Sequence, residues 1–487
     1  MKSLILSLSN RSPSALKNLP KYVDPTATRP LLNCTLANSS KDYTSGFPVG
    51  NTYDRPKTTM NRNAQILGIL LSLLLGIGSL SISAANTPGI EGIKIGKDDW
   101  PWWRGTNRNG HANAQEVPIK WSENQNIVWR AEIPGRGHAS PVVIGERIFI
   151  ATADEDSQTQ HIICLDKATG QTRWSAQIHQ GGWEGRIHDR NTQASSTVAS
   201  DGKSVFATFM YDSHIWLTSL NLKGEIQWQK KASDFVSHWG YSTSPAIYKS
   251  FVIVGSDHKE GGNLTAFDRR TGELVWNVER PAIPNYASPV IYNLNGRDQL
   301  VLPGCDLMAS YDPATGQEIW SIPATTRETV GSVVTDGKHV FASGGFPKNE
   351  TSCITADGSN TIVWKSPIRV YAPSMIIVDG YLYAMTDKGL AHCWNASTGD
   401  LMWREKVGGD FSASPTLVSG NLFVPSEQGK MIVFKANPEK FELLAENQLG
   451  DESWSSLAIS KDRLYLRVAH IEDECRSEAL YCIAESN

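Results

Sequence analysis

The residues with the widest chemical range in this 487-residue sequence are histidines that stand among polar and aromatic side chains. Imidazole titrates near neutral pH and ligates metals, so a group of such residues can form a site. The candidates for ligand binding are Arg186, His188, Asn191, His238, Trp239, Asp257 and Asp306. No pair of them has a metal-binding spacing such as His-x-x-x-His, so no metal ligand and no catalytic residue is assigned. The alternative is that they are ordinary polar loop residues.

The elements that must position these residues belong to a repeated unit. The segment 166–174, which reads Asp-Lys-Ala-Thr-Gly-Gln-Thr-Arg-Trp, recurs in full or shortened form. Later copies end at Trp228, Trp276, Trp320, Trp364 and Trp403. A small residue, often followed by Pro as in Ser140-Pro141, opens each unit, and turns such as Asp201-Gly202 predict hairpins inside it. No segment shows a sustained helical period, so each unit is expected to form about four short strands.

The number of units predicts the fold class, which is an all-β eight-bladed propeller. Eight openings and eight final strands can be counted, but the two series are offset. The last opening, near Ser455, is followed by no final strand, whereas a surplus one at 127–130 precedes the first opening. We expect this N-terminal strand to complete the eighth blade and close the ring. The loops that carry most histidines would then share one face.

Tryptophans at the ends of the units are expected to dock neighbouring blades against each other. They are Trp129, Trp174, Trp228, Trp276, Trp320, Trp364 and Trp403. In the preceding turn, Asp and Thr can bond the backbone, and Gly can adopt the positive φ that the turn needs. Burying one Trp removes about 150–250 Å² from water, so the repeated motif is interpreted as structural.

The cysteines follow the same repeat. Four of them, Cys164, Cys353, Cys393 and Cys482, occupy one repeated strand position that Ser, Ala or Val fills in other units. Such a position is interpreted as a small buried packing site. A disulfide between Cys475 and Cys482 across the last hairpin is kept as an alternative, because export would place the chain in an oxidising compartment.

The N-terminal region predicts export. Residues 60–85 have the pattern of a signal peptide, with Arg62 before an apolar run and Ser83-Ala84-Ala85 after it. We expect Met60 to be the true start and 1–59 to be a non-native or disordered extension; a long presequence or an uncleaved anchor are the alternatives. Residues 86–126 form a Trp-rich leader, and 127–487 form the propeller. The expected location is periplasmic or secreted.

The Thr-Gly-x-x-x-Trp segments resemble the pyrroloquinoline quinone (PQQ) propeller repeat and the tryptophan-docking motif of quinoprotein dehydrogenases. The segment 99–110, which reads Asp-Trp-Pro-Trp-Trp-Arg-Gly-Thr-Asn-Arg-Asn-Gly, resembles the PQQ-like propeller proteins common in planctomycetes, as do 137–141 and 188–197. The resemblance covers the chain from Asp99 onward. Its relatives include dehydrogenases, the outer-membrane assembly scaffold lipoprotein and domains fused to kinases, so it implies the fold more than an activity.

The resemblance implies PQQ and Ca²⁺ if the chain is a dehydrogenase. The sequence lacks the adjacent Cys pair of the alcohol class and a Cys-x-x-Cys-His haem signature, and it has no kinase motif set. We therefore favour an exported, non-catalytic, monomeric propeller that binds a small ligand or an envelope protein partner through one face, without PQQ or Ca²⁺. A PQQ-dependent dehydrogenase and a scaffold in outer-membrane protein assembly are the alternatives. The net charge of −4 gives no reason to expect nucleic acid, and membrane contact is expected only through the signal segment.

Overall fold

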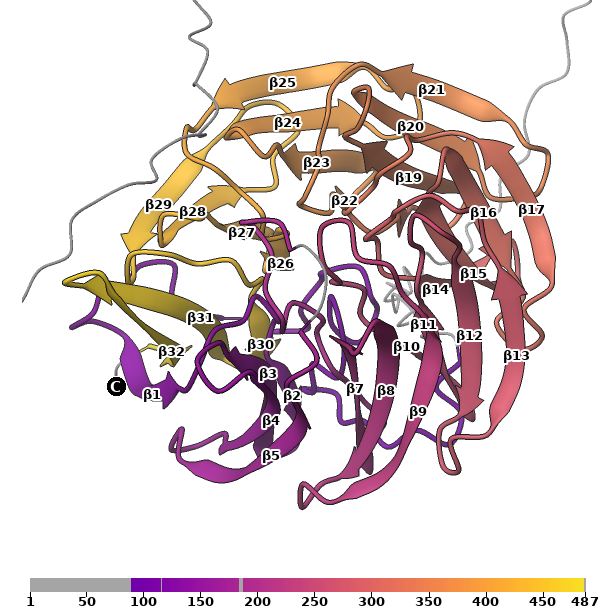
Figure 1. Cartoon of the computed structure of the whole chain (residues 1–487). Helices are drawn as coiled ribbons and strands as arrows, with labels where there is room; N and C mark the ends of the chain where they lie inside the picture. The colour runs from indigo at the N-terminus through magenta and orange to yellow at the C-terminus, as the bar shows by residue number, and fades with distance from the viewer. Residues whose placement is uncertain (1–88, 115, 184–186, 486–487) are drawn as a thin grey trace, which may run out of the picture. The chain divides into compact units, whose positions relative to one another are not determined.

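The computed structural model describes residues 89–485 apart from 115 and 184–186, so the segments 1–59 and 60–85 lie outside the described residues. Within this part, thirty-two strands form eight four-stranded antiparallel sheets, which are the blades of a ring (Figure 1). The expected all-β eight-bladed propeller is therefore confirmed. The described residues contain no helix with the length and apolar character of a membrane span.

The first four blades follow one another along the chain. Blade 1 consists of β2 (Val142–Ile144), β3 (Arg147–Asp154), β4 (Thr159–Asp166) and β5 (Thr172–Gln180). Blade 2 consists of β6 (Ala199–Ser200), β7 (Ser204–Tyr211), β8 (His214–Asn221) and β9 (Ile226–Asp234). Blade 3 consists of β10 (Ala246–Tyr248), β11 (Phe251–Gly255), β12 (Asn263–Asp268) and β13 (Leu274–Glu279). Blade 4 consists of β14 (Val290–Leu294), β15 (Arg297–Gly304), β16 (Leu307–Tyr311) and β17 (Glu318–Pro323).

The remaining blades complete the ring. Blade 5 consists of β18 (Val334–Thr335), β19 (His339–Gly344), β20 (Glu350–Thr355) and β21 (Ile362–Ser366). Blade 6 consists of β22 (Ile376–Val378), β23 (Tyr381–Met385), β24 (Leu390–Asn395) and β25 (Leu401–Lys406). Blade 7 consists of β26 (Thr416–Val418), β27 (Asn421–Pro425), β28 (Lys430–Lys435) and β29 (Leu443–Gln448). Blade 8 consists of β30 (Ala458–Ser460), β31 (Arg463–Glu472), β32 (Cys475–Ile483) and β1 (Ile127–Ile133).

The burial pattern of the strands follows their place in the blade. The first strands lie innermost, around the ring axis, and the fourth strands form the outer edge (Figure 1). The middle strands, such as β3, are buried on both faces because neighbouring blades cover them, and they carry continuous apolar runs. The fourth strand β5 is largely exposed along its first half. The core therefore lies between the blades, and the first strands are left to line the hub, which is the space around the axis.

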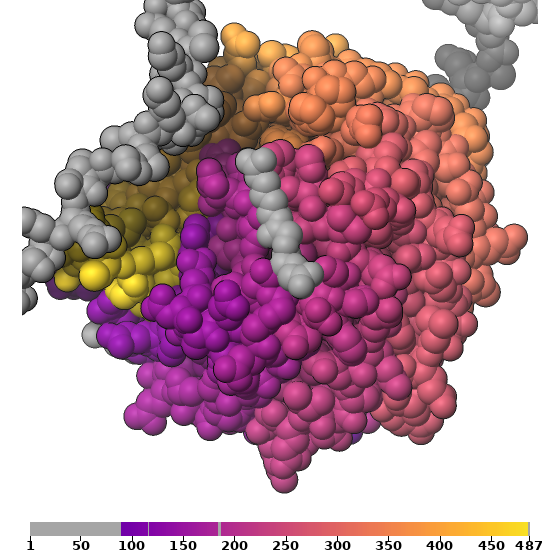
Figure 2. Space-filling view, in the orientation of Figure 1, coloured from indigo at the N-terminus to yellow at the C-terminus, as the bar shows by residue number. Residues whose placement is uncertain are grey.

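The ring is closed by the first strand of the chain, as expected. The strand β1 pairs antiparallel with β32, where Trp129 faces Cys482 and Arg130 faces Tyr481. In Figure 2 the purple first blade lies beside the yellow last blade. This arrangement leaves no unfinished blade, because one strand from the beginning of the chain joins three from its end.

The repeated tryptophans lie at the boundaries between blades. Trp129 Nε1 donates to the carbonyl oxygen of Lys167 in blade 1 (3.1 Å), and Trp174 Nε1 donates to that of Leu222 in blade 2 (3.0 Å). Trp228, Trp364 and Trp403 make the same kind of bond to the next blade. Trp320 differs, since its Nε1 donates to Gln299 Oε1 of its own blade. Five of the docking tryptophans thus bond the turn that the repeat motif forms in the next blade, and Trp276 Nε1 is buried without a hydrogen-bond partner in the described residues.

The glycine of the turn motif must have no side chain, because the docking indole lies against it. Gly170 has φ +72°, and a Cβ there would lie 2.6 Å from the ring of Trp129. Gly170→Ala is expected to lower the free energy of unfolding by about 2–4 kcal/mol, from backbone strain and overpacking together. Gly420→Ala, at φ +77° with nothing within 4 Å, is the control for strain alone and is expected to cost about 1–2 kcal/mol. Denaturant unfolding measures both variants, and equal losses would contradict the docking role.

The cysteines pack as expected, but the disulfide alternative is wrong. Cys164 lies opposite Trp174, and burial raises the pKa of its thiol to about 12. Cys475 and Cys482 lie on the same strand, β32, with the first exposed and the second buried. Seven residues of extended strand separate them by about 23 Å, which no disulfide can bridge.

The leader packs across the ring instead of extending from it. The backbone of Trp100 pairs with Val143 of β2, and the Arg108 guanidinium donates to the carbonyl oxygen of Ile247 in β10. The Arg104 guanidinium donates to Met375 beside β22, and the backbone of Gly110 and Ala112 pairs with Leu417 of β26. Through these bonds one short segment reaches blades 1, 3, 6 and 7. It therefore ties the innermost strands together at the hub.

Candidate functional site

Hydroxyl side chains at the start of the eight blades form a circle around the hub. This hydroxyl belt consists of Ser140, Thr197, Ser244, Ser288, Ser332, Ser374, Ser414 and Ser456. In seven of the eight neighbouring pairs, the backbone N–H of one member donates to the side-chain oxygen of the next at 2.8–3.0 Å. Because each link joins two blades, the belt fixes the innermost strands and presents polar atoms to the ring axis.

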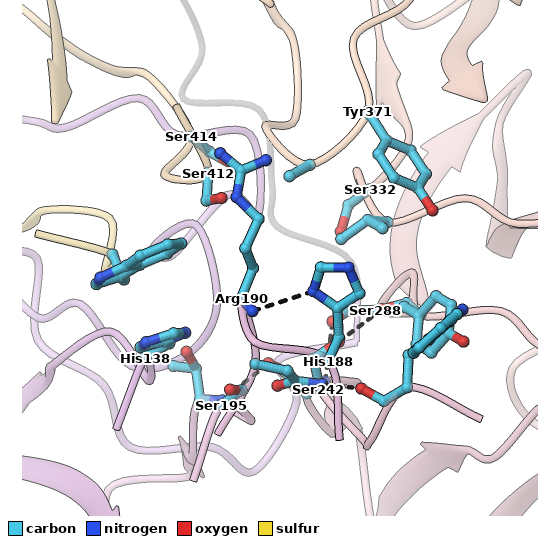
Figure 3. A pocket seen from close by; sticks show the side chains of 18 of the residues that line it. His138, His188, Arg190, Ser195, Ser242, Ser288, Ser332, Tyr371, Ser412 and Ser414 are labelled. Carbon is cyan, nitrogen blue, oxygen red and sulfur yellow. Dashed lines mark hydrogen bonds between the residues drawn. The ribbon is translucent and has the colours of Figure 1, made fainter. Parts of the chain in front are cut away.

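The hub holds a cavity of about 410 Å³, which we call the hub cavity. This volume lies within the usual range for small-molecule sites. Aromatic rings supply much of its wall, namely Trp103, Trp239, Tyr286, Phe346, Tyr371 and Trp454. Hydroxyl groups supply another part, and Figure 3 shows Ser195, Ser242, Ser288, Ser332, Ser412 and Ser414 around His188 and Arg190. The wall thus combines flat apolar surfaces with groups that donate and accept hydrogen bonds.

The leader separates the hub cavity from the opposite face of the ring. Its hydrogen bonds reach the first strands just past the hydroxyl belt, on the side away from the loop that carries His188. Trp103 lines the cavity, and its Nε1 donates to Ser332 Oγ at 3.0 Å, at the one place where the belt has no link of its own. The cavity therefore ends on an indole ring, and a ligand would enter from the His188 side.

Two long loops bring four of the sequence candidates together on the cavity wall. The Asn191 side chain donates to the carbonyl oxygen of Trp239 at 2.9 Å, and the His188 backbone N–H donates to the same oxygen at 3.2 Å. His188 Nδ1 accepts the backbone N–H of Arg190, which leaves the proton of the neutral ring on Nε2 (Figure 3). His238 also lines the cavity, with its ring 4.5 Å from that of Trp239.

On the opposite wall, His138 is an uncharged aromatic group. Its ring stacks on Trp454 with centroids 4.7 Å apart and planes 6° from parallel. Burial, reinforced by the nearby Arg136, Arg467 and Arg476 guanidiniums, holds the pKa of His138 well below its usual range. Its Nε2 is buried, with no hydrogen-bond partner among the described residues. The stack therefore offers a ligand a flat surface without a charge.

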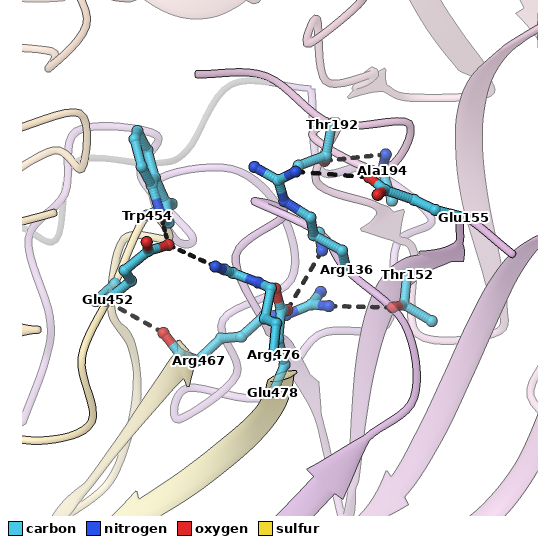
Figure 4. Close-up of polar contacts among 12 residues, drawn as sticks. Arg136, Thr152, Glu155, Thr192, Ala194, Glu452, Trp454, Arg467, Arg476 and Glu478 are labelled. Atoms are coloured by element: carbon cyan, nitrogen blue, oxygen red, sulfur yellow. Dashed lines mark hydrogen bonds and ion pairs between the residues drawn. The ribbon is translucent and has the colours of Figure 1, made fainter. Parts of the chain in front are cut away.

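A partly buried network of ion pairs holds Trp454 in place at the seam between blades 8 and 1 (Figure 4). Trp454 Nε1 donates to Glu452 Oε2 at 2.9 Å, and Arg476 links Glu452 to Glu478. Arg467 donates to Glu478 at 2.5 Å and to the carbonyl oxygen of Ala151 at 2.7 Å. The charges balance locally, so the network fixes the wall without adding a net charge to the cavity.

The charge of Arg190 is compensated within the protein. Its guanidinium donates to both carboxylate oxygens of Glu427, at 2.5 and 3.2 Å, and lies 3.7 Å from Asp410. It also lies over the Trp454 ring, 5.9 Å from the centroid. Such a bidentate pair is held in one geometry, so Arg190 shapes the cavity more than it attracts an anion.

One carboxyl group on the wall has no such partner. Glu328 lines the cavity and is 6% exposed, and no donor among the described residues reaches its side-chain oxygens. Burial raises the pKa of this carboxyl group, and His238 partly offsets the shift. The hydroxyl group of Tyr286, also on the wall, is buried without a hydrogen-bond partner in the described residues.

The other sequence candidates lie elsewhere. Asp257 is buried in an ion pair with Arg280, whose Nε donates to its two oxygens at 2.8 and 3.0 Å. Asp306 is exposed in the turn between β15 and β16 and does not line the hub cavity. Arg186 falls in the segment 184–186, outside the described residues. The structure thus groups His188, Asn191, His238 and Trp239, and it separates both aspartates from them.

His179, near the end of β5, is held neutral between blades 1 and 2. Its Nδ1 bonds Gln160 Oε1 at 2.9 Å, its Nε2 accepts from the Gln229 amide at 3.1 Å, and its ring stacks on Tyr211. This tautomer leaves no nitrogen free to take up a proton, and burial lowers the pKa of His179 to about 4.

His179 is therefore expected to make stability depend on acid pH. An unfolded histidine takes up its proton near pH 6.5, so the free energy of unfolding should fall as pH drops from about 6.5 to about 4. The contribution is at most about 3 kcal/mol, and it is fully lost below the folded pKa. His179→Gln should flatten the decline in denaturant unfolding measured between pH 7 and pH 4. A slope equal to that of the unchanged protein would contradict this interpretation.

Several wall residues carried no strong sequence signal. Glu328, Phe346 and Tyr371 lie in the loops before, within and after blade 5, whose repeat opening near Ser332 is weak. The belt serines stand in the sequence as strand openings, and no local pattern there marks them as a polar lining. Trp103 belongs to the leader motif, and no local pattern in the sequence indicates that this motif lies under the hub.

The fold and its repeated docking tryptophans define the chain as a PQQ-repeat β-propeller. The family model described as outer membrane protein assembly factor BamB matches residues 119–233, 158–384 and 363–467. The chain belongs to this family.

Individual relatives are distant. The outer membrane protein assembly factor BamB of Burkholderia pseudomallei is 23% identical over 317 residues, which cover 60% of this chain and 73% of that protein. A europium-containing methanol dehydrogenase superposes with a TM-score of 0.61 at 11% identity, covering 81% of this chain and 99% of that one. The structure of BamB from Moraxella catarrhalis superposes with a TM-score of 0.51 at 12% identity, covering 73% of this chain and 99% of that one. At these identities the solved structures show the shared fold alone.

Proposed function

We propose that this chain is an envelope binding protein that holds a small ligand in the hub cavity, on the face that carries His188 and Trp239. The observation that carries the proposal is the cavity itself, in which six aromatic rings and a circle of hydroxyl groups surround about 410 Å³. Ring faces and hydroxyl groups together favour a ligand with a flat or ring-shaped body and hydrogen-bonding substituents.

The charges of the wall weigh against the quinone cofactor of the dehydrogenase relatives. PQQ carries three carboxylates, whereas the Arg190 guanidinium is already paired with Glu427. Glu328 adds a carboxyl group of the same sign as the cofactor. No group of three His, Cys, Asp or Glu side chains in the described part of the chain is placed to hold a metal ion such as the Ca²⁺ of those enzymes. The described residues therefore do not fit PQQ with Ca²⁺, and no redox step is derived.

A bulky side chain placed in the cavity tests the proposal. The probe is phenyl β-glucoside, which is uncharged and carries both a ring and hydroxyl groups, and binding is measured by titration calorimetry. Ser242→Trp, in the cavity wall, is expected to weaken binding at least about tenfold by occupying the site. Ser250→Trp makes the same change at an exposed turn and should bind as the unchanged protein does. Equal binding by both variants would contradict a ligand site in the hub.

A second proposal is a scaffold role in outer-membrane protein assembly through an envelope protein partner. Family membership favours it, because the matching family model and the Burkholderia relative carry that description. The loops around the cavity mouth would then contact the partner. Crosslinking from Asp189, which is exposed in the loop that carries His188, tests this role against a control site at Ser250 on another part of the ring. Equal yields of partner crosslinks from both sites would contradict it.

A further inference from the structure

The wall of the hub cavity contains a negative group that the protein does not neutralise. Glu328 is 6% exposed, and its backbone is fixed by pairing with Phe346 and by the Thr326 hydroxyl group, which donates to its carbonyl oxygen. In the described residues, no lysine or arginine forms an ion pair with its carboxylate. A carboxyl group with so little contact with water and no partner is poorly stabilised, so its position in a cavity wall calls for a complementary ligand group.

Two of the neighbouring arginines are engaged elsewhere. Arg190 is bound by Glu427, and Arg369 donates to Asp387 at 2.7 Å. Arg327 is exposed to solvent and does not line the cavity; it acts on Glu328 electrostatically but forms no ion pair with it. His238 is therefore the titratable cavity-wall group that acts most strongly on Glu328. A positive charge that enters the cavity would find the Glu328 carboxylate open to it.

Aromatic rings surround this carboxyl group. Tyr286 and Tyr371 lie close enough for their hydroxyl groups to interact electrostatically with Glu328 and with each other, and Phe346 lies beside its backbone. All three rings line the hub cavity. Ring faces attract ammonium groups, and the combination of several rings with one carboxylate is how proteins recognise organic amines.

We propose that the hub cavity recognises the ammonium group of a small organic amine, with the Glu328 carboxylate as the counter-ion and the rings of Tyr286 and Tyr371 beside it. This inference rests on the proposed ligand site and adds the charge of the ligand. An ammonium group would stabilise the ionised form of Glu328, whereas a neutral ligand would leave the carboxylate without a counter-ion.

Three probes of one shape and different charge test the inference by titration calorimetry at pH 7. They are benzylamine, benzyl alcohol and benzoate, which are cationic, neutral and anionic. Benzylamine is expected to bind at least about tenfold more tightly than benzyl alcohol, from the ion pair and the cation–π contacts together. Glu328→Gln should remove this preference and change the affinity for benzyl alcohol by no more than about twofold.

Two further variants keep the result interpretable. Tyr286→Phe retains the ring and should retain the preference for the amine, which shows that a change in the same wall does not by itself abolish binding. Glu405→Gln, at an exposed position of β25, should leave both affinities unchanged. Equal affinity for amine and alcohol in the unchanged protein, or tighter binding of benzoate, would overturn the amine inference and leave the hub site standing. Binding of no probe would instead count against the proposed function.

Discussion

Asp257→Ala is expected to lower the free energy of unfolding by about 3–5 kcal/mol, because it leaves the Arg280 guanidinium as an unpaired buried charge. The Arg280 side chain is 0% exposed and that of Asp257 is 3% exposed. Asn285 also donates to Asp257, and Arg280 donates to the Tyr311 hydroxyl group. Burial opposes the charge of Arg280, but the contact with Asp257 outweighs it, and the pKa of Arg280 is raised. Denaturant unfolding measures the loss.

The double variant Asp257→Leu with Arg280→Met is the matched control. It removes both charges and fills the space with apolar groups, so it should recover most of the lost stability. All three proteins should bind phenyl β-glucoside alike at temperatures where they are folded, since Asp257 lies outside the hub cavity. A stable Asp257→Ala protein with impaired binding would make Asp257 a ligand residue and contradict this assignment.

Trp102→Ala is expected to cost about 3–5 kcal/mol, which is the usual loss for removing a buried tryptophan. The side chain is 2% exposed within the core formed by the inner parts of blades 2 and 3, among residues that include Phe206 and Tyr241. The Arg108 guanidinium lies over the ring at 4.5 Å from its centroid. Thermal and denaturant unfolding both report the change, because the leader would lose one of its buried apolar anchors.

Trp102→Phe is the control for this variant. It keeps a ring under Arg108 and should cost less than half as much as Trp102→Ala. The adjacent Trp103 ends the hub cavity, so Trp102→Ala should also weaken the binding of phenyl β-glucoside. Unfolding of Trp102→Ala at the same denaturant concentration as the unchanged protein would mean that the leader is not an integral part of the ring.

The fold could be predicted because its determinants are local and repeated. Each turn of the type formed by Asp166, Thr169 and Gly170 is complete within a few residues, and each places one tryptophan against the next blade. The offset between openings and final strands predicted the closure by β1, because an unpaired strand edge would otherwise remain. Blade 7 could be recognised as a repeat unit although Ala445 occupies the position at which the other blades have Trp.

The site could be predicted only in part, because it joins residues from all around the ring. His188, Asn191, His238 and Trp239 come from two neighbouring long loops, so chain proximity and aromatic content pointed to them. Links such as the one from Ser456 N to Ser140 Oγ join residues 316 positions apart, which no spacing pattern reveals. The position of Asp257 in a connection between strands predicts that it faces the solvent or a ligand. In the structure it is buried and forms an ion pair with Arg280.

Locating a heavy-atom probe in crystals of this protein tests most directly whether the hub is the binding site. The probe is 4-bromobenzyl alcohol, which is neutral and therefore does not depend on the role of Glu328. Anomalous scattering from the bromine should place it in the hub cavity, among the rings of Trp239, Tyr286 and Tyr371. Bromine peaks confined to the outer edges of the blades, with none in the hub, would contradict the central claim.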